Sequence, residues 1–441
     1  MNKKTENKAV SPWQWVPSLY FAQGIPYVVV MSVAVILFKR MGMSNTDIAL
    51  YTSGLNLPWV IKPLWSPLVD LLKTKRWWIV VMQILVGAGL AGIALTIQGP
   101  LAFRYCLAFM WLLAFSSATH DIAADGFYML GLNEKKQAYF VGIRSTFYRF
   151  AVIFGQGILV MFAGWLEQRY AREMPEPAAI PQAWSLTFYL LTILFALLFV
   201  YHYLFLPHPR RDTCTLPPQQ ASAGRVFKEF LGTFTSFFQK KHIVSALIFI
   251  LLYRFAEAQL VKITSPFLLD TPATGGLALS TAEVGFIYGT IGVIALTIGG
   301  IVGGIAMARR GLKSCLWTMT IAMNLPNIVY LYLSFARPES IGIISGCVAI
   351  EQFGYGFGFT SLTYFMMLFS NGKHQTAHYA ICTGFMALGL MLPGMISGWI
   401  EESIGYRAFF VWIMLCTIPS FWATHLVRKN LTDNHSDNSS R

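Results

Sequence analysis

The 441-residue chain is 55% hydrophobic and only 12% charged, a composition that excludes an ordinary soluble domain and is typical of a protein solvated mostly by lipid. The formal net charge is +13, but no basic stripe with interleaved aromatic residues accompanies it, so we expect no nucleic-acid partner. The Lys and Arg residues instead form short clusters between apolar stretches, as in membrane proteins. The six cysteines show no metal-like or redox-like spacing, and we expect neither a metal nor another cofactor.

Apolar stretches of roughly 20 residues or more, enough to cross a bilayer, recur along the whole chain. The first six are expected near 14–38, 48–72, 77–97, 101–130, 138–166 and 184–206. Six more are expected near 242–268, 282–308, 313–335, 340–370, 375–400 and 404–427. The polar, proline-containing segment between the two sets predicts three regions, which are an N-terminal six-helix bundle (1–206), a cytoplasmic linker (207–241) and a C-terminal six-helix bundle (242–441).

The distribution of Lys and Arg predicts how the helices are oriented. The termini, the linker and every second connection together hold 21 Lys and Arg residues, whereas the alternate connections hold 7. Positively charged loops stay in the cytoplasm. We therefore expect a multi-pass protein of the cytoplasmic (inner) membrane with both termini in the cytoplasm, and the N-terminus shows no removable signal peptide.

The two halves of the chain resemble each other. Phe-Ala-Gln at 21–23 matches Phe-Ala-Glu at 255–257, and about twenty residues later Ser44 with Asp47 matches Ser280 with Glu283. Each Ser-x-x-acid pattern is a capping box that begins the second helix of its half. These matches predict an all-α membrane protein whose twelve transmembrane helices form two six-helix pseudo-repeats.

A turn after the second helix carries a further pattern. Asp70 is followed by basic residues that end at Arg76, which resembles the small-x-x-x-acid and basic loop signature of the major facilitator superfamily. The corresponding turn of the second half has Arg309 and Arg310 but lacks the acid. We expect Asp70 and Arg76 to belong to a cytoplasmic gate.

Ionisable residues inside the expected first-half spans are costly in hydrocarbon and therefore candidates for function. Asp121 and Asp125 stand one turn apart in helix 4, and helix 5 supplies Arg144 and Arg149. Asp121 and Arg149 both lie roughly 20 Å from the loop that joins their helices at 1.5 Å per residue, which predicts an ion pair. Asp125 and Arg144 lie nearer the cytoplasm, and we expect a gate-side ion pair.

The second half carries a comparable set. Arg254 and Glu257 are three residues apart in helix 7, and Glu351 with Gln352 lies near the centre of helix 10. We expect the proton that is coupled to transport to bind within a set of three acids, Asp121, Glu257 and Glu351. The arginines, Arg149 and Arg254, would then be charge partners or contacts for an anionic substrate. The alternative is that these groups form permanent ion pairs that only lock helices together.

Other side chains are candidates for contact with substrate. Gln352 is an amide next to Glu351, Gln23 is the residue that the repeat aligns with Glu257, and Tyr253 could stack on a sugar ring. Lys62 lies between two prolines in helix 2 and faces either the cavity or, by extending its stem, the interface. His120 could titrate near neutral pH, although a histidine beside an aspartate is more often a hydrogen-bonded neighbour.

Three segments resemble the muropeptide permease (AmpG) and acetyl-CoA transporter family of the major facilitator superfamily. They are 62–70 (KPLWSPLVD), 119–127 (THDIAADGF) and 253–257 (YRFAE), with weaker support from 351–352 and 376–380. The resemblance runs over nearly the whole chain and implies the major facilitator fold and a proton-driven importer whose bacterial members take up anhydro-muropeptides. Two positions depart from the family, which usually has Gln where this chain has His120 and His378.

These features predict a monomeric secondary transporter, a proton-coupled symporter that imports an amino-sugar or peptidoglycan fragment by alternating access. An exporter of drugs or metabolites is a second reading, because charge pairs do not reveal direction. A membrane-embedded acyl or glycosyl transferase is a third. The segments show no nucleophile partnered with a base, and the longest polar stretch is too short for a catalytic domain, so we expect no enzyme.

Overall fold

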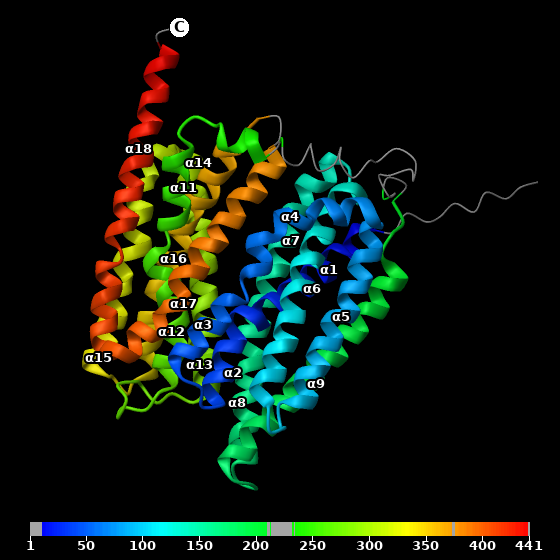
Figure 1. Ribbon diagram of the computed structural model, residues 1–441, viewed down its shortest axis with the longest axis vertical. Coiled ribbons are helices and arrows are strands. Elements are labelled where there is room, and N and C mark those ends of the chain that lie inside the picture. The colour runs from blue at the N-terminus through cyan, green and yellow to red at the C-terminus, as the bar shows by residue number, and fades with distance from the viewer. Residues whose placement is uncertain (1–10, 210–211, 213–231, 233, 373–374, 440–441) are drawn as a thin grey trace, which may run out of the picture. The chain divides into compact units, whose positions relative to one another are not determined.

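The computed structural model describes residues 11–209, 212, 232, 234–372 and 375–439, and all regular elements in these ranges are helical (Figure 1). Eight stretches of this part are long and apolar enough to cross a membrane, judged by length and composition. Two of them, Thr281–Ala336 and Ala377–Asn430, contain a glycine with a positive φ, Gly311 at 71° and Gly405 at 74°. Glycine adopts this backbone conformation without strain; Gly311 lies between two expected spans, and Gly405 lies at the second residue of the last expected span.

The helices of the first half follow the expected spans closely. Helix 1 consists of α1 (Val16–Val28), the π-helical segment η2 (Val29–Val33) and α2 (Ala34–Arg40), and helix 2 of α3 (Asn45–Gly54) and α4 (Leu57–Leu72). Helices 3 and 4 are α5 (Lys75–Thr96) and α6 (Ala102–Gly131). Helix 5 consists of α7 (Glu134–Val152), the π-helical segment η3 (Ile153–Ile158) and α8 (Leu159–Tyr170), and helix 6 is α9 (Glu176–Phe205).

The second half begins with α11 (Ile243–Leu252) and α12 (Phe255–Leu269), which form helix 7. Helices 8 and 9 comprise α13 (Thr281–Val284), the π-helical segment η4 (Gly285–Gly292), α14 (Val293–Asn324), η5 (Leu325–Asn327) and α15 (Ile328–Ala336). Helix 10 is α16 (Ile341–Phe369), which lies beside α14 (Figure 1). Helices 11 and 12 are α17 (Gln375–Leu415) and α18 (Ile418–Ser439).

Both predicted Ser-x-x-acid patterns begin helices, and the second of them forms a complete capping box. The Ser44 hydroxyl accepts a hydrogen bond of 3.0 Å from the backbone N–H of Asp47 at the start of α3. At the start of α13, Ser280 and Glu283 bond to each other's backbone N–H, which completes the box. These bonds satisfy N–H groups that a helix start leaves without partners.

The described helices pack into two compact units. Unit 1 comprises the ranges 1–28, 65–152 and 185–220, and unit 2 comprises 29–64, 153–184 and 221–441. One half of helices 1, 2 and 5 therefore packs with the C-terminal part of the chain. The predicted regions 1–206, 207–241 and 242–441 stay a prediction, because the packing units group residues in a different way.

Unit 2 owes its grouping to close approaches between backbones. A Cβ atom on Gly289 of η4 would lie only 2.0 Å from the carbonyl oxygen of Gln156 in η3. A Cβ atom on Gly398 of α17 would lie 1.9 Å from the carbonyl oxygen of Asn45 in α3. Only glycine allows such contacts, as expected for the small-residue packing of membrane helices.

Candidate substrate and proton sites

The polar cluster of unit 1 lies where α1, α6 and α7 meet. Asp121 and Asp125 are one turn apart on α6, and the Gln23 amide of α1 donates a hydrogen bond to the Asp121 carboxylate. Asp125 accepts a 3.0 Å hydrogen bond from the Tyr20 hydroxyl and forms a 3.4 Å ion pair with Arg144 of α7. The Arg144 guanidinium also donates to the Tyr20 oxygen at 3.1 Å. The expected Asp125–Arg144 ion pair is therefore present, while its role in a gate stays a prediction.

The predicted ion pair between Asp121 and Arg149 is wrong. Within the described ranges no hydrogen bond or ion pair involves the Arg149 side chain, and its buried Nη1 atom lacks a partner. Arg144 and Arg149 are five residues apart, so at about 100° per residue they point about 140° away from each other. The prediction compared depths alone, whereas the direction around the helix axis decides which arginine faces α6.

His120 belongs to a separate, buried chain of hydrogen bonds. Its Nε2 atom lies 3.1 Å from the Gln83 amide of α5, and the same amide lies 2.8 Å from Nδ1 of His202 in α9. Nε2 of His202 lies 3.0 Å from the Ser18 hydroxyl. Both histidines are buried. The arrangement favours the interpretation of His120 as a hydrogen-bonded neighbour inside the helix bundle.

The polar cluster of unit 2 contains two buried carboxylates, Glu257 of α12 and Glu351 of α16, which are 3% and 1% exposed. Glu257 interacts electrostatically with Glu351 and with Arg254. Glu351 Oε2 accepts hydrogen bonds from the Gln352 amide at 2.9 Å and from the Tyr330 hydroxyl at 3.1 Å. Among the described residues, Glu351 Oε1 and Glu257 Oε2 have no hydrogen-bond partner. The cluster thus combines two buried carboxylates, each with one oxygen that accepts no hydrogen bond from the described residues.

An interruption of helix 7 lies beside these carboxylates. α11 ends at Leu252 and α12 begins at Phe255, and Arg254 between them has φ −108° and ψ 23°. The Arg254 guanidinium donates a hydrogen bond to the Tyr355 hydroxyl and lies 4.9 Å from the centre of that ring and 5.1 Å from the Phe359 ring. Discontinuous helices commonly form the solute sites of transporters.

Tyr253 is not available for the predicted stacking on a sugar. The side chain is fully buried in a core cluster of unit 2. Its hydroxyl donates to the Gly358 carbonyl at 3.1 Å and lies 2.8 Å from the Ser361 hydroxyl. Lys62, another predicted cavity residue, is partly buried on α4.

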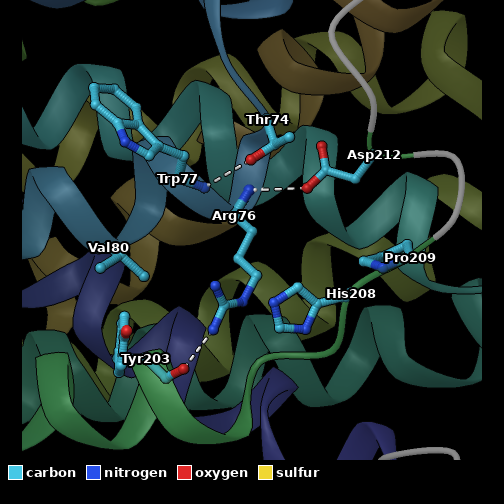
Figure 2. Close-up of a pocket in the computed structure, with 8 residues that line it drawn as sticks. All are labelled: Thr74, Arg76, Trp77, Val80, Tyr203, His208, Pro209 and Asp212. Atoms are coloured by element: carbon cyan, nitrogen blue, oxygen red, sulfur yellow. Dashed lines mark hydrogen bonds between the residues drawn. The ribbon is translucent and has the colours of Figure 1, made fainter. Parts of the chain in front are cut away.

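Arg76 clamps the end of a helix, as Figure 2 shows. Its guanidinium donates hydrogen bonds to the carbonyls of Tyr203 and, at 3.3 Å, of Leu206 at the C-terminus of α9, where a positive charge is favourable. The Asp212 carboxylate accepts the backbone N–H of Arg76 at 3.0 Å. The predicted partner, Asp70, has a side chain that lies outside the described residues, so the Asp70–Arg76 gate stays a prediction.

The second half has a similar clamp. Lys240 donates hydrogen bonds of 2.7 and 2.8 Å to the carbonyls of Phe369 and Asn371 at the C-terminus of α16. Partial burial lowers the pKa of the Lys240 ammonium below its ordinary value. In both halves, a cation from another segment satisfies carbonyls at a helix end.

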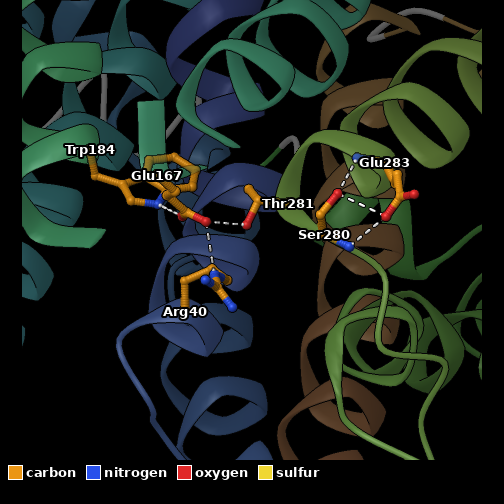
Figure 3. Close-up of polar contacts among 6 residues, drawn as sticks. All are labelled: Arg40, Glu167, Trp184, Ser280, Thr281 and Glu283. Carbon is orange, nitrogen blue, oxygen red and sulfur yellow. Dashed lines mark hydrogen bonds and ion pairs between the residues drawn. The ribbon is translucent and has the colours of Figure 1, made fainter. Parts of the chain in front are cut away.

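Unit 2 also contains a buried acid that joins four segments, the Glu167 cluster (Figure 3). Glu167 of α8 is 6% exposed and forms a 3.1 Å ion pair with Arg40 of α2. It also accepts hydrogen bonds from Trp184 Nε1 of α9 at 2.8 Å and from the Thr281 hydroxyl of α13 at 2.7 Å. Segments of the first half of the sequence are thereby joined to the second half.

A second network of the same unit, the Glu401 cluster, has the same effect. The Asn45 amide of α3 donates hydrogen bonds to the Glu401 carboxylate at 2.6 Å and to the Tyr406 hydroxyl at 2.8 Å, both on α17. Tyr406 donates to Asp270 at 2.5 Å, and Asp270 forms a 2.7 Å ion pair with Lys39 of α2. Because these residues stand near helix ends, the two clusters connect helix ends across the repeat.

The sequence reasoning missed several ionisable residues of unit 2, among them Glu167, Glu401 and the buried Lys262 of α12. Each stands in or beside an expected apolar span, so the rule that selected Glu257 would have found them. No group of three His, Cys, Asp or Glu side chains within the described ranges is placed to hold a metal ion.

Comparison with known proteins identifies the family. The family model of the Major Facilitator Superfamily matches residues 18–376. The chain belongs to the major facilitator superfamily. It is therefore a multi-pass membrane transporter and not an enzyme, as the sequence predicted.

Curated relatives within this superfamily confirm the predicted resemblance. The "Putative transporter AmpG 4" of Rickettsia conorii is 25% identical over 415 residues, which cover 92% of this chain and 93% of the relative. The "Anhydromuropeptide permease" of Escherichia coli K12 is 24% identical over 420 residues, which cover 94% of this chain and 79% of the relative.

A solved structure of a D-xylose–proton symporter shares the major facilitator fold with this chain. The TM-score is 0.69 at 12% sequence identity, and the match covers 94% of this chain and 96% of the symporter. The likeness confirms the predicted fold class of twelve helices.

Proposed function

We propose that this chain is a proton-coupled importer of anhydromuropeptides or related amino-sugar solutes. The proposal places it as a monomer in the cytoplasmic membrane, with both termini and the 207–241 linker in the cytoplasm. The similarity to the anhydromuropeptide permease of Escherichia coli supports the solute class, and the excess of Lys and Arg in one set of connections supports the orientation.

The single observation that carries proton coupling is the pair Glu257 and Glu351. Two buried carboxylates that interact electrostatically repel each other when both are ionised, so one bound proton relieves the repulsion. Glu257 Oε2 and Glu351 Oε1 accept no hydrogen bond from the described residues, so either oxygen can carry that proton. A change of conformation that moves Arg254 relative to Glu257 would then release it, which couples proton movement to the solute.

Asp121 is the corresponding candidate in unit 1. Its carboxylate accepts a hydrogen bond from Gln23, the residue that the repeat aligns with Glu257. We propose that the Gln23 and Gln352 amides, which bond to carboxylates in this structure, exchange these bonds for bonds to solute hydroxyls. Amides can donate and accept at once, as sugar recognition requires.

The two networks that join the halves of the sequence support alternating access. The Glu167 and Glu401 clusters connect helix ends that lie, in the predicted orientation, on the non-cytoplasmic side. We propose that both clusters are intact when this side is closed and break when it opens. The bistable element is then the packed contact of α3 with α17 and of η3 with η4.

Uptake of a radiolabelled anhydromuropeptide into proteoliposomes tests the proposed function. With the outside one pH unit more acidic, one proton per solute drives accumulation of at most about 10-fold, because one pH unit corresponds to a tenfold ratio. We expect accumulation by the wild type with the gradient and only equilibration without it. Glu351→Gln and Asp121→Asn should each abolish proton-driven uptake while expression stays intact.

Glu339→Gln is the matched control, because Glu339 is an exposed acid outside both clusters, and it should accumulate solute like the wild type. Uptake by the wild type that ignores the pH gradient would contradict proton coupling. Wild-type accumulation by both Glu351→Gln and Asp121→Asn would contradict the residue assignment.

A further inference from the structure

Arg254 is a buried cation that is not paired with the nearest acid of its own helix. It is 7% exposed. Glu257 stands three residues later, a spacing at which opposite charges on a continuous helix commonly pair. Within the described ranges, no ion pair joins Arg254 to Glu257, and Glu257 Oε2 accepts no hydrogen bond. Other contacts therefore hold the guanidinium in this conformation.

Two aromatic residues of α16 supply these contacts. The Arg254 guanidinium donates a hydrogen bond to the Tyr355 hydroxyl, and it lies 4.9 Å from the centre of the Tyr355 ring and 5.1 Å from the centre of the Phe359 ring. The two rings are one helical turn apart, with their centres 5.9 Å from each other. Arginine binds the faces of aromatic rings, and the attraction is stronger where water is excluded. The Tyr355–Phe359 pair thus binds the cation without supplying a negative charge.

The contact leaves Arg254 able to move. Its φ of −108° and ψ of 23° lie outside the helical conformation, so the three-residue spacing alone does not bring its side chain to Glu257. Among the described residues, Arg254 Nε has no hydrogen-bond partner. A guanidinium with an unused donor gains a charge-assisted hydrogen bond when it moves to a carboxylate. The two rings and the Glu257 carboxylate are therefore alternative partners for one cation.

We propose that Tyr355 and Phe359 are positioning residues that keep Arg254 from pairing with Glu257 while the proton is bound. As long as the rings hold the cation, repulsion between Glu257 and Glu351 favours one bound proton. When Arg254 leaves the rings and pairs with Glu257, the ionised carboxylate is stabilised and the proton leaves. The inference rests on the proposed function, because it names residues that control proton release at the same site.

The pH dependence of transport reports where Arg254 lies. The charged groups that act on Glu257 are Glu351 and Arg254, and the hydroxyls of Tyr288 and Tyr330 interact electrostatically with both carboxylates. A substitution in the Tyr355–Phe359 pair leaves these acids and hydroxyls in place and changes only what competes for the guanidinium.

Accumulation of a radiolabelled anhydromuropeptide in proteoliposomes, measured over a series of external pH values at a constant pH gradient, tests the pair. In Phe359→Leu, Arg254 loses one ring and pairs with Glu257 more readily, so the same accumulation requires a higher proton concentration. We expect the pH of half-maximal accumulation to fall by about one unit, the effect of one desolvated cation–π contact.

Three further variants isolate the cause. Phe359→Tyr keeps a ring face and should retain the wild-type pH dependence. Tyr355→Phe keeps the ring and loses the hydroxyl, so it should shift the pH of half-maximal accumulation in the same direction, which keeps the test decisive if Phe359→Leu does not fold. Phe353→Leu is the control, because Phe353 is a 38% exposed aromatic residue of the same helix, and it should behave like the wild type.

The outcomes separate this inference from the proposed function. If the wild type accumulates the solute and both Phe359→Leu and Tyr355→Phe keep its pH of half-maximal accumulation, the positioning role is overturned and the proposed function stands. Lower uptake at every pH without a shift would assign the rings a purely structural role and also overturn it. A shift toward higher pH, or an equal shift in Phe353→Leu, would do the same. Absence of proton-driven accumulation by the wild type would overturn both proposals.

Discussion

Truncation of Glu167 should shift the protein toward the state in which the non-cytoplasmic side is open. In Glu167→Ala, Arg40 loses its ion pair, and the Trp184 and Thr281 donors lose their acceptor. Because Glu167 is 6% exposed, water does not replace it in the closed state, and breaking a buried pair costs about 3 kcal/mol or more. In the open state we expect water to solvate the same donors.

The free-energy difference converts into a population. About 3 kcal/mol corresponds to about a 100-fold shift of the equilibrium between closed and open states at 1.36 kcal/mol per decade. Ser53 reports this shift, because it is fully buried between α3 and α17 and a reagent reaches it only when these helices separate. The alkylation rate of Ser53→Cys by a membrane-impermeant maleimide, added outside in a cysteine-free background, should rise about 100-fold.

Two controls make the result interpretable. Glu173→Ala removes an exposed acid from the turn that follows the same helix 5 and should leave the rate unchanged. Ala273→Cys lies in an exposed turn and should react equally fast in all variants, which also tests the predicted orientation. An unchanged Ser53→Cys rate in Glu167→Ala, or an equal rise in Glu173→Ala, would refute the reasoning.

Three further changes follow from the contacts. Gly289→Ala places a Cβ atom 2.0 Å from the Gln156 carbonyl oxygen, so we expect overpacking to destabilise the protein by about 1–3 kcal/mol. Thermal unfolding in detergent measures this loss, and Gly304→Ala is the control, because a Cβ atom on Gly304 meets open space. Arg144→Met should reduce uptake by removing the ion pair of Asp125, and exchange of the two residues, Asp125→Arg with Arg144→Asp, should restore part of it if the ion pair is the reason. Arg76→Met should lower the melting temperature by a few degrees, because the α9 carbonyls lose their donors, and an unchanged value would show that water replaces the guanidinium.

Much of the architecture was predictable because it depends on local chemistry. Ser44 and Ser280 cap helices where the sequence pattern placed them, since a capping box involves only residues three positions apart. The turn at Gly311 follows from two arginines and a glycine between apolar runs. The Asp125–Arg144 pair was also found, because both residues lie close to the loop that joins their helices and few geometries separate them.

The failures concern directions around helix axes and long-range contacts. Arg149 and Asp121 share a depth, but a residue's azimuth depends on how its helix rotates against its neighbours. Tyr253 was predicted to face the cavity, but it is packed in the core. The sequence of an apolar helix does not distinguish an aromatic residue that faces the core from one that faces a cavity. The contact of Asn45 with Glu401 joins residues far apart in the sequence, and no local sequence pattern predicts it.

The sequence by itself determined that this protein crosses the membrane repeatedly and which superfamily it belongs to. Hydropathy and loop charge determine insertion and orientation in the bilayer, and both are local properties of the sequence, as are the short motifs. The tertiary structure alone decided which ionisable side chains inside the helices have partners. It satisfies Asp125 and Glu167 and leaves Glu257 and Lys262 without hydrogen-bond partners within the described part of the chain. Pairing depends on the rotation and spacing of packed helices, which only the assembled bundle fixes.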